Sequence, residues 1–158
     1  LYIVYDNEGY GNTGFQASPA SPLGSRTATS MFGTPWQKKD IFEIWRSHRP
    51  PYVASISPHD VVDLAEKVER ARSFRGPKLF LAPAVCPPGW GFEPALGDDL
   101  ARLAIETGLW PLKEAIDGSV RPQRRFRHLF HPVRREDLLG KIQANVDRYW
   151  QAVCSSTP

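Results

Sequence analysis

The chain has 158 residues, of which 41% are hydrophobic, enough for one domain with a core and too few for two ordinary domains. Its 20 basic and 17 acidic side chains leave a formal charge of +3, which excludes a polyelectrolyte and does not by itself indicate a nucleic-acid binder. The 15 prolines and 12 glycines predict many turns, while the 11% aromatic content excludes a weakly hydrophobic, unfolded segment.

The chain contains no apolar run that approaches the roughly 18 residues needed to span a bilayer, and no basic-then-apolar signal opens it. We therefore expect a soluble protein with no membrane partner. Its two cysteines, Cys86 and Cys154, are too few for a disulfide framework and fit a reducing compartment such as the cytoplasm. Because Leu1 already lies in an apolar strand pattern, we interpret the chain as part of something longer.

The first predicted element is a short strand over residues 1–5, which are apolar, β-branched or aromatic and therefore expected to be buried. It stops at a turn over residues 6–9. Residues 10–36 contain several glycines, prolines and hydroxyl side chains and show no helical or strand period, which predicts a long loop. Loops of this length in compact domains usually bind ligands or close over them.

Residues 38–48 are expected to form a helix, with Ile41, Ile44 and Trp45 on its inward face. The prolines at positions 50 and 51 end this helix, because the residue before a proline disfavours helical geometry. A strand over residues 52–56 follows.

The next predicted helix begins at Ser57, a residue type that caps helices, with Pro58 at the first helical position. It ends before the Gly76-Pro77 pair. Its apolar residues recur at helical spacing and are expected to face inward: Val61, Leu64, Ala65, Val68 and Ala71. A buried strand over residues 78–82 comes next.

Alternating strands and helices predict an α/β fold, a mostly parallel sheet flanked by helices. In such sheets functional loops lie at the carboxyl ends of the strands, where the loops after Tyr5 and Ala82 both begin. Further along, the pattern predicts a helix over 98–106, a strand over 109–116 with a turn at residues 117–118, and a closing helix over 136–153.

The turn after the first strand carries oxygen-bearing side chains and permissive glycines over residues 6–14. Mg2+ prefers oxygen ligands, and glycines let the backbone approach a pyrophosphate. Most turns rich in Asp, Asn and Gly are nevertheless only turns, so this chemistry alone leaves both interpretations open.

Several motifs in one order are more specific than any one of them. They are Tyr5-Asp6-Asn7-Glu8-Gly9-Tyr10-Gly11-Asn12-Thr13-Gly14-Phe15-Gln16, Thr27-Ala28-Thr29-Ser30, Tyr52-Val53-Ala54, Cys86-Pro87-Pro88-Gly89-Trp90 and Glu106-Thr107-Gly108-Leu109-Trp110-Pro111-Leu112. In order and spacing they resemble the thiamine-diphosphate-binding β subunit of the 2-oxoacid:ferredoxin oxidoreductases. The resemblance implies that residues 1–118 are the C-terminal part of a thiamine-diphosphate-binding domain, and that residues 119–158 are a basic segment with a C-terminal helix.

This resemblance also implies a cofactor site at the turn. Thiamine diphosphate would be held through Mg2+, with the Asn7 side chain and the Gly9 backbone carbonyl as metal ligands and Asn12 as the catalytic residue facing the cofactor or substrate. The implied cofactor-binding residues are Asp6, Asn7, Gly9, Tyr10, Asn12 and Thr13. The family's remaining metal ligand, in a Gly-Asp-Gly motif, and the carboxylate that activates the cofactor lie outside this chain, which should therefore not be a competent enzyme by itself.

Cys86 is a second candidate site residue. A lone cysteine in a loop is usually a buried small hydrophobe, and two cysteines cannot hold a cluster unaided. By resemblance, however, Cys86 looks like the fourth ligand of a [4Fe-4S] cluster whose other cysteines come from outside the chain. Cys154 is interpreted as structural or incidental.

The function implied by the resemblance is oxidative decarboxylation of a 2-oxoacid by the catalytic β subunit of a hetero-oligomer, in the cytoplasm. Electrons would pass through iron–sulfur clusters to ferredoxin, and coenzyme A would accept the acyl group in the members that form acyl-CoA. Pyruvate is the first expectation, with branched, aromatic and indole-derived 2-oxoacids and oxalate left open. Gly11 stands where relatives often carry a larger residue, which predicts a roomier substrate pocket.

An alternative function rests on the stretch from Arg121 to Arg135, which holds six arginines, two histidines and two phenylalanines and no acidic residue. Basic and aromatic residues together suit RNA or single-stranded DNA in a non-enzymatic binding module. We favour a solvated arm or subunit contact instead, because the net charge of the chain is small. His128 and His131 are a weak candidate metal pair.

Overall fold

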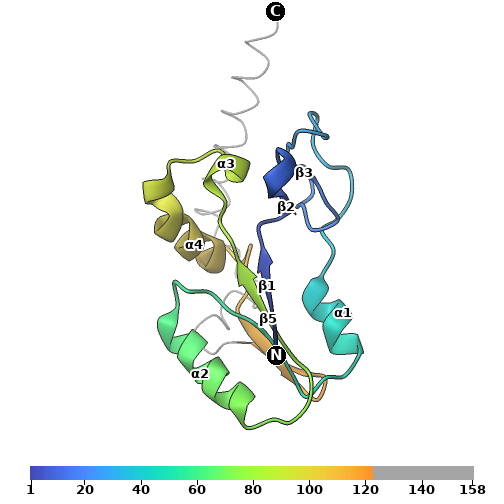
Figure 1. Ribbon diagram of the computed structural model, residues 1–158, viewed down its shortest axis with the longest axis vertical. Helices are drawn as coiled ribbons and strands as arrows, with labels where there is room; N and C mark the ends of the chain where they lie inside the picture. Colours follow the sequence, from blue (N-terminus) through green and yellow to red (C-terminus); the bar gives the residue numbers. More distant parts are fainter. Residues whose placement is uncertain (123–158) are drawn as a thin grey trace, which may run out of the picture. The chain divides into compact units, whose positions relative to one another are not determined.

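The structure, a computed structural model, describes residues 1–122 (Figure 1). Its elements in chain order are β1 (Tyr2–Asp6), β2 (Gly9–Tyr10), η1 (Gly11–Thr13), β3 (Gln16–Ala17), α1 (Ile41–Ser47), β4 (Tyr52–Ser55), α2 (Val61–Arg72), β5 (Lys78–Pro83), α3 (Pro87–Trp90), η2 (Pro94–Leu96), α4 (Gly97–Glu106), β6 (Lys113–Ile116) and β7 (Ser119–Pro122).

The main sheet has five strands in the order β1-β5-β4-β6-β7. β5 pairs in parallel with both β1 and β4, whereas β6 is antiparallel to β4 and to β7. β6 therefore runs against the other four strands. This mixed sheet, mostly parallel and flanked by helices, confirms the expected α/β class. β2 and β3 form a separate two-stranded ribbon within the long loop.

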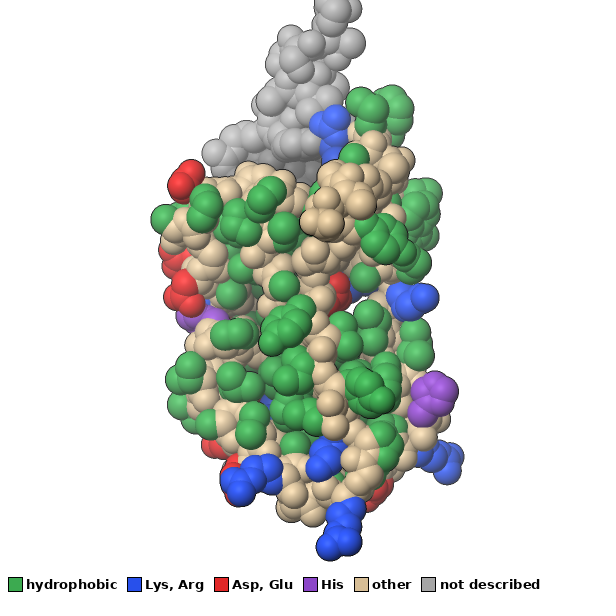
Figure 2. All heavy atoms as spheres, in the orientation of Figure 1, with side chains coloured by type: hydrophobic (Ala, Val, Ile, Leu, Met, Phe, Trp, Pro, Cys, Tyr) green, Lys and Arg blue, Asp and Glu red, His purple; other side chains and the backbone are tan. Residues whose placement is uncertain are grey.

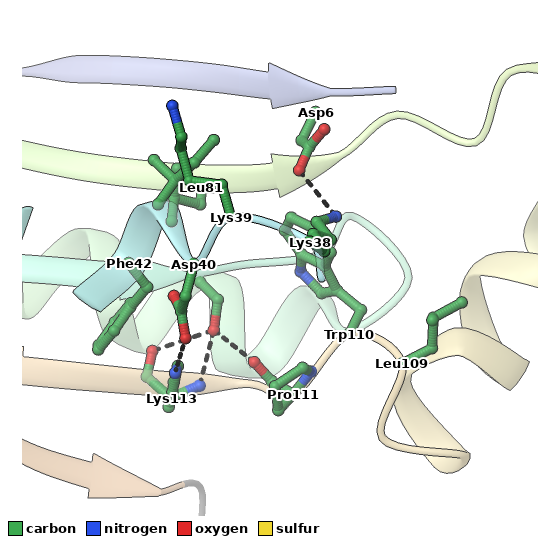
Figure 3. A pocket seen from close by; sticks show the side chains of 12 residues that line it. Asp6, Lys38, Lys39, Asp40, Phe42, Leu81, Leu109, Trp110, Pro111 and Lys113 are labelled. Atoms are coloured by element: carbon green, nitrogen blue, oxygen red, sulfur yellow. Dashed lines mark hydrogen bonds and ion pairs between the residues drawn. The ribbon is translucent and has the colours of Figure 1, made fainter. Parts of the chain in front are cut away.

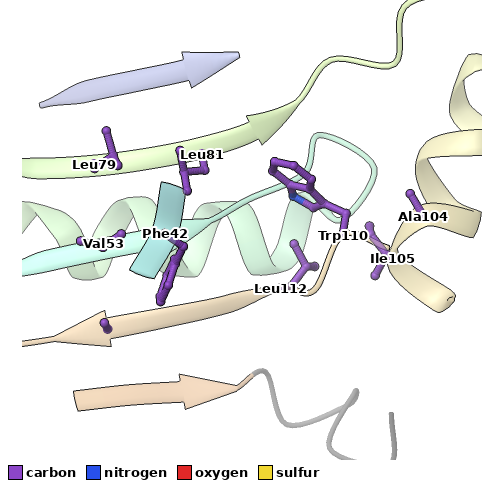
Figure 4. Close-up of a cluster of buried hydrophobic side chains, with 9 residues drawn as sticks. Phe42, Val53, Leu79, Leu81, Ala104, Ile105, Trp110 and Leu112 are labelled. Atoms are coloured by element: carbon purple, nitrogen blue, oxygen red, sulfur yellow. The ribbon is translucent and has the colours of Figure 1, made fainter. Parts of the chain in front are cut away.

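One face of the sheet carries the larger apolar cluster (Figure 4). Val53 of β4 and Leu79 and Leu81 of β5 point to this face because side chains alternate along a strand. Phe42 of α1 packs on them, and Ala104 and Ile105 of α4 join the same cluster with Trp110 and Leu112. This cluster therefore packs α1 and α4 against one face of β4 and β5.

The opposite face is covered by α2 and combines an apolar cluster with a buried ion pair. Tyr52, Ala54, Phe80 and Ala82 pack with Ala71 of α2. Beside them the Lys67 ammonium donates to the Asp63 carboxylate at 2.7 Å and to the Ser55 carbonyl at 2.7 Å. Since Ser55 ends β4, this lysine fixes α2 to the carboxyl edge of the sheet.

The expectation that the first strand is buried was wrong, although the strand itself is present. Tyr2 is 63% exposed and Tyr5 74% exposed, and Leu1 and Ile3 are exposed as well. The physical reason is that β1 lies at an edge of the sheet and pairs only with β5 among the described strands. Figure 2 shows hydrophobic side chains gathered over the region where Figure 1 places β1 and β5.

The helix expected over residues 38–48 is shorter, because the Asp40 side chain caps α1 by accepting from the Glu43 amide at 3.0 Å. Its inward face also differs from the expectation. Phe42 is buried, whereas Ile44 is 43% exposed. Ile41 and Trp45 pack partly against the core as expected.

The expected cap of the second helix was also wrong, since Asp60 and not Ser57 caps α2. The Asp60 amide donates to the Ser57 carbonyl at 3.1 Å, so residues 57–60 make a turn before the helix starts. Val61 and Val68, expected to face inward, are exposed, and polar Lys67 and Asp63 take inward positions.

The turn expected at residues 117–118 is confirmed and joins β6 to β7 as a tight hairpin. Asp117 and Gly118 have φ angles of 46° and 83°, the left-handed geometry that such hairpins require. Among residues 1–122 the structure contains no helix that is both long and apolar enough to cross a membrane.

Several expectations concern residues that the structure does not describe. The closing helix over 136–153, the His128 and His131 pair, Cys154 and all of the basic stretch beyond residue 122 lie outside the described part of the chain.

Candidate functional site

The two loops that the sequence singled out leave the sheet side by side. β1 and β5 are adjacent and parallel, with Asp6 in register with Pro83. Just beyond the strand ends the Ala84 amide donates to the Asp6 carbonyl at 2.9 Å. The turn after β1 and the cysteine-containing loop after β5 therefore begin at the same edge of the sheet, as expected.

Residues 6–9, here called the Asp6–Gly9 turn, are held by their own side chains. The Asp6 carboxylate accepts from the Glu8 amide at 2.9 Å, and the Asn7 side-chain oxygen accepts from the Gly9 amide at 3.3 Å. Such side chain to backbone bonds are characteristic of Asx turns. Glu8 has a φ of 66°, a left-handed conformation that few non-glycine residues adopt.

Both carboxylates of the Asp6–Gly9 turn are buried and contact one lysine. The Lys38 ammonium lies 3.0 Å from an Asp6 carboxylate oxygen and 2.6 Å from a Glu8 carboxylate oxygen. Burial raises the pKa of the Glu8 carboxyl, while its hydrogen bond to Lys38 acts in the opposite direction. The sequence contained no signal for Lys38, because it reaches Glu8 from 30 residues away.

The loop after β5 packs directly against the Asp6–Gly9 turn. The indole N–H of Trp90 donates to the Asn7 carbonyl at 3.1 Å. Cys86 immediately precedes α3, and its carbonyl accepts from the Trp90 amide at 2.8 Å. Its thiol is free and half-buried. The motif that contains Cys86 thus touches the predicted metal-binding turn through Trp90.

Close packing between these loops depends on a glycine. A Cβ at Gly89 would lie 2.1 Å from the ring of Phe15, far inside van der Waals contact.

A second glycine lies close to the predicted metal ligand. A Cβ at Gly11 would lie 2.8 Å from the side-chain nitrogen of Asn7. Glycine at position 11 therefore leaves room for the Asn7 amide.

The remaining predicted cofactor residues lie in η1 and at its start. Tyr10, Asn12 and Thr13 are exposed, and the Thr13 hydroxyl bonds to the Gln16 side chain. Asn7 and Gly9 are half-buried and Asp6 is buried. These six residues are already neighbours in the sequence, and in the structure the segment has a buried end at Asp6 and an exposed end at η1.

Two cavities flank this segment. One, of about 240 Å³, lies at the carboxyl ends of β1, β4 and β5, and its lining includes Asp6, Lys38, Ser55, Leu81 and Trp110 (Figure 3). The other, also about 240 Å³, is lined by residues that include Glu8, Phe15 and Trp90. Asn7 and Gly9 are not among the lining residues of either cavity.

The donor set fits a hard divalent cation that draws its other ligands from elsewhere. The Asn7 side chain supplies an amide oxygen, and oxygen atoms are the ligands that Mg2+ prefers. Within residues 1–122 the structure contains no group of three His, Cys, Asp or Glu side chains placed to hold a metal ion. A metal at the turn would therefore use an amide oxygen, a backbone carbonyl and groups from a cofactor or another polypeptide.

A comparison with protein families matches residues 1–81 to the thiamine pyrophosphate enzymes, at the C-terminal TPP-binding domain. Among curated proteins, the chain is similar to the pyruvate synthase subunit PorB of Methanothermobacter marburgensis, with 40% identity over 96% of this chain and 58% of that protein. It is also similar to the ketoisovalerate oxidoreductase subunit VorB of Pyrococcus abyssi, with 37% identity over 75% of this chain and 40% of that protein.

Among solved structures, the chain is similar to the 2-oxoglutarate:ferredoxin oxidoreductase from Magnetococcus marinus, determined with 2-oxoglutarate, coenzyme A and succinyl-CoA bound. The TM-score is 0.51 and the identity 26%, over 58% of this chain and 31% of that chain. The chain thus spans little more than half the length of PorB. These matches confirm the resemblance to 2-oxoacid:ferredoxin oxidoreductases, and the chain belongs to the thiamine pyrophosphate enzymes through their C-terminal TPP-binding domain.

Proposed function

We propose that this chain forms the cofactor-binding part of a 2-oxoacid:ferredoxin oxidoreductase and acts only together with other subunits. The observation that carries this proposal is the Asp6–Gly9 turn at the carboxyl edge of the sheet, within a domain whose family binds thiamine pyrophosphate. The relatives named as pyruvate synthase and ketoisovalerate oxidoreductase subunits support a 2-oxoacid substrate.

Asn7 and Gly9 would hold the metal ion that anchors the cofactor's diphosphate. Their amide and carbonyl oxygens suit Mg2+, and the small residue at position 11 leaves the Asn7 side chain room to reorient. When bound, thiamine diphosphate supplies the electron sink for decarboxylation, and the protein supplies position and electrostatics. The Trp90 N–H holds the Asn7 carbonyl, so the cysteine loop would orient the metal-binding residue.

Asn12 would contact the cofactor or substrate from η1, with Tyr10 and Thr13 beside it. These three side chains are exposed in this chain, so another subunit or the cofactor would cover them in the assembled enzyme. Asp6 would contribute to cofactor binding by holding the Asp6–Gly9 turn in place, because its carboxylate already accepts from the Glu8 amide and pairs with Lys38.

Cys86 would supply one ligand to a [4Fe-4S] cluster, with the other cysteines from outside the chain. Its free thiol lies in the segment that touches the Asp6–Gly9 turn, which would place a cluster near the cofactor. Such a cluster would pass electrons toward ferredoxin, with coenzyme A accepting the acyl group. We propose pyruvate as the substrate because the relatives with the higher identities include pyruvate synthase subunits.

The cofactor proposal is tested by titrating thiamine diphosphate into the assembled complex with and without Mg2+. We expect saturable binding that requires the metal and that Asn7→Ala weakens at least tenfold. Gln37→Ala, at an exposed loop position, is the matched control and should leave binding unchanged. Equal binding by the wild type and Asn7→Ala would contradict the assignment of Asn7.

The cluster proposal is tested by electron paramagnetic resonance of the reduced complex. Cys86→Ala should remove or alter one [4Fe-4S] signal, whereas Cys154→Ala, at the other cysteine of the chain, should leave all signals intact. Comparing kcat/KM for pyruvate, 2-oxoisovalerate and 2-oxoglutarate then tests the substrate. Preference for either longer acid would contradict pyruvate.

A further inference from the structure

Lys38 connects two buried carboxylates that lie on either side of Asn7 in the sequence. Its ammonium is 3.0 Å from an oxygen of Asp6 and 2.6 Å from an oxygen of Glu8. Both acidic side chains are 8% exposed, and the lysine side chain is 26% exposed. The ammonium therefore balances two negative charges that have little contact with water, unlike an exposed surface ion pair.

Each of these carboxylates fixes a different part of the turn. The oxygen of Asp6 that Lys38 does not contact accepts from the Glu8 amide at 2.9 Å. Glu8 itself has the left-handed φ of 66°, and its carbonyl accepts from the Ser21 hydroxyl at 2.5 Å. Because left-handed geometry is unfavourable for glutamate, surrounding contacts must hold it. Lys38 holds the side chain and Ser21 holds the backbone.

Lys38 is itself well placed by the end of the long loop. The Lys39 amide donates to the Pro19 carbonyl at 2.8 Å, and Asp40 caps α1 directly afterwards. The Lys38 ammonium also lies 5.3 Å from the centre of the Trp110 ring, a cation–π distance. Figure 3 shows the lysine reaching Asp6 across the cavity, with Trp110 beside it. The backbone next to Lys38 is thus held by hydrogen bonds, which directs the lysine side chain toward the Asp6–Gly9 turn.

Removing this ammonium would leave two buried carboxylates two residues apart without their shared cation. Repulsion and the cost of burying both charges would then favour opening the turn toward water. Opening would move Asn7, which lies between the two acids, and Gly9, whose amide bonds to the Asn7 side chain. The oxygens proposed to bind the metal would lose their arrangement, although Lys38 touches neither of them.

We propose that Lys38 is a positioning residue that holds the Asp6–Gly9 turn in the conformation needed to bind metal and diphosphate. This inference rests on the proposed function for its consequence in binding. The claim that Lys38 holds the turn closed does not depend on that function, because it is argued from the ion pairs with Asp6 and Glu8.

The test uses Lys38→Met in the assembled complex, with Lys39→Met as the matched control at an exposed neighbouring position. Hydrogen exchange is measured on the complex without cofactor, for peptides covering residues 5–10 and, as an internal reference, residues 52–56. We expect exchange in the first peptide to rise at least tenfold in Lys38→Met and to stay unchanged in Lys39→Met. The reference peptide should not change in either variant.

Binding of thiamine diphosphate in the presence of Mg2+ is measured on the same proteins. We expect Lys38→Met to raise the Kd at least tenfold and Lys38→Arg to restore most of the affinity, because arginine keeps the positive charge. Unchanged exchange and unchanged Kd in Lys38→Met would overturn the inference. If the wild type itself bound no thiamine diphosphate, the proposed function would fail. The exchange data would still show whether Lys38 holds the Asp6–Gly9 turn.

A milder variant keeps the inference testable if Lys38→Met does not assemble. Glu8→Gln removes one of the two negative charges that Lys38 balances. Combining it with Lys38→Met leaves one uncompensated buried carboxylate instead of two, so we expect this double variant to assemble and to raise exchange in residues 5–10 by a smaller factor than Lys38→Met alone. Faster exchange spread equally over residues 52–56 would indicate general loosening and would contradict a local clamp.

Discussion

Two of the lysine–carboxylate clusters at the carboxyl edge of this sheet differ in what they join. Lys67 pairs with Asp63 one helical turn away and donates to the Ser55 carbonyl, so it ties α2 to the end of β4. Lys38 pairs with Asp6 and with Glu8, which is 30 residues away along the chain, and ties a loop to the turn after β1. The first cluster braces the framework, whereas the second shapes the candidate site.

Burial separates the two clusters further. Lys67 is 3% exposed, and burial lowers its pKa while raising the pKa of the Asp63 carboxyl. Lys38 keeps 26% of its side chain exposed. The same chemistry therefore produces a fully buried pair on the α2 face of the sheet and, at the site, a cluster whose lysine is partly exposed. We expect the first to control stability and the second to control ligand binding.

The largest expected effect on stability comes from Lys67→Met. Methionine fills the space but leaves the Asp63 charge buried without its partner, which costs about 3–5 kcal/mol. Urea denaturation measures this loss as a lower midpoint at an unchanged slope. A loss below about 1 kcal/mol would show that water reaches the pair, and the contrast between the two clusters would then disappear.

Ser21→Ala is expected to rank second and to affect both stability and binding. The Ser21 hydroxyl is fully buried, donates to the Glu8 carbonyl and accepts from the Ser18 amide at 3.0 Å. Removing it leaves two polar groups unpaired, at a cost of about 1–3 kcal/mol. Thermal unfolding and thiamine diphosphate titration check both effects. Ser47→Ala, at an exposed serine, should change neither, and a loss of stability without a loss of affinity would separate Ser21 from the clamp.

Tyr52→Phe should cost less, about 1 kcal/mol. The Tyr52 hydroxyl donates to the Glu114 carboxylate at 2.6 Å, but Arg70 also donates to that carboxylate at 2.6 Å. The acid therefore keeps a charged partner when the hydroxyl is lost. Chemical denaturation measures the change, and a cost as large as that of Lys67→Met would mean that this network, and not Lys67, braces the α2 face.

Arg72→Met should have the smallest effect, below about 0.5 kcal/mol. Its ion pair with Glu69 has both side chains 73% exposed, so solvent screens the attraction. The same denaturation experiment provides the baseline for the comparison. A cost above about 1 kcal/mol would mean that side-chain exposure does not predict how much an ion pair contributes to the free energy of unfolding in this protein.

The succession of the main strands and helices along the chain followed from local patterns in the sequence, whereas their order in the sheet did not. Residues 52–56 and 78–82 are mostly apolar, which is typical of the centre of a mostly parallel sheet, and they form β4 and β5 as predicted. Residues 1–5 show the same pattern but form an exposed edge strand. Composition cannot distinguish these cases, because burial depends on what covers the strand.

Long-range polar contacts were the part that the sequence could not predict. The sequence motifs singled out Asn7 and the Cys86 loop as candidates, but nothing in the pattern linked Lys38 to Glu8 or Trp90 to the Asn7 carbonyl. The inward face of α2 was mispredicted for a related reason. Lys67 is polar by type and was not expected inside, yet an acceptor on β4 and an acid one turn earlier pair with it there.

The most direct test of the account is to ask whether the Gly9 carbonyl binds the metal that holds the cofactor. The complex is prepared with glycine labelled with 13C at the carbonyl, loaded with Mn2+ and thiamine diphosphate, and measured by electron–nuclear double resonance. We predict 31P coupling from the diphosphate and a 13C coupling that disappears in Gly9→Ala, because alanine places an unlabelled carbonyl there. A Cβ at position 9 would lie 3.0 Å from the Phe15 ring, so persistence of the 31P coupling in Gly9→Ala is the control that the cofactor is still bound. A 13C coupling that persists in Gly9→Ala, or 31P coupling with no 13C coupling in the wild type, would contradict the account.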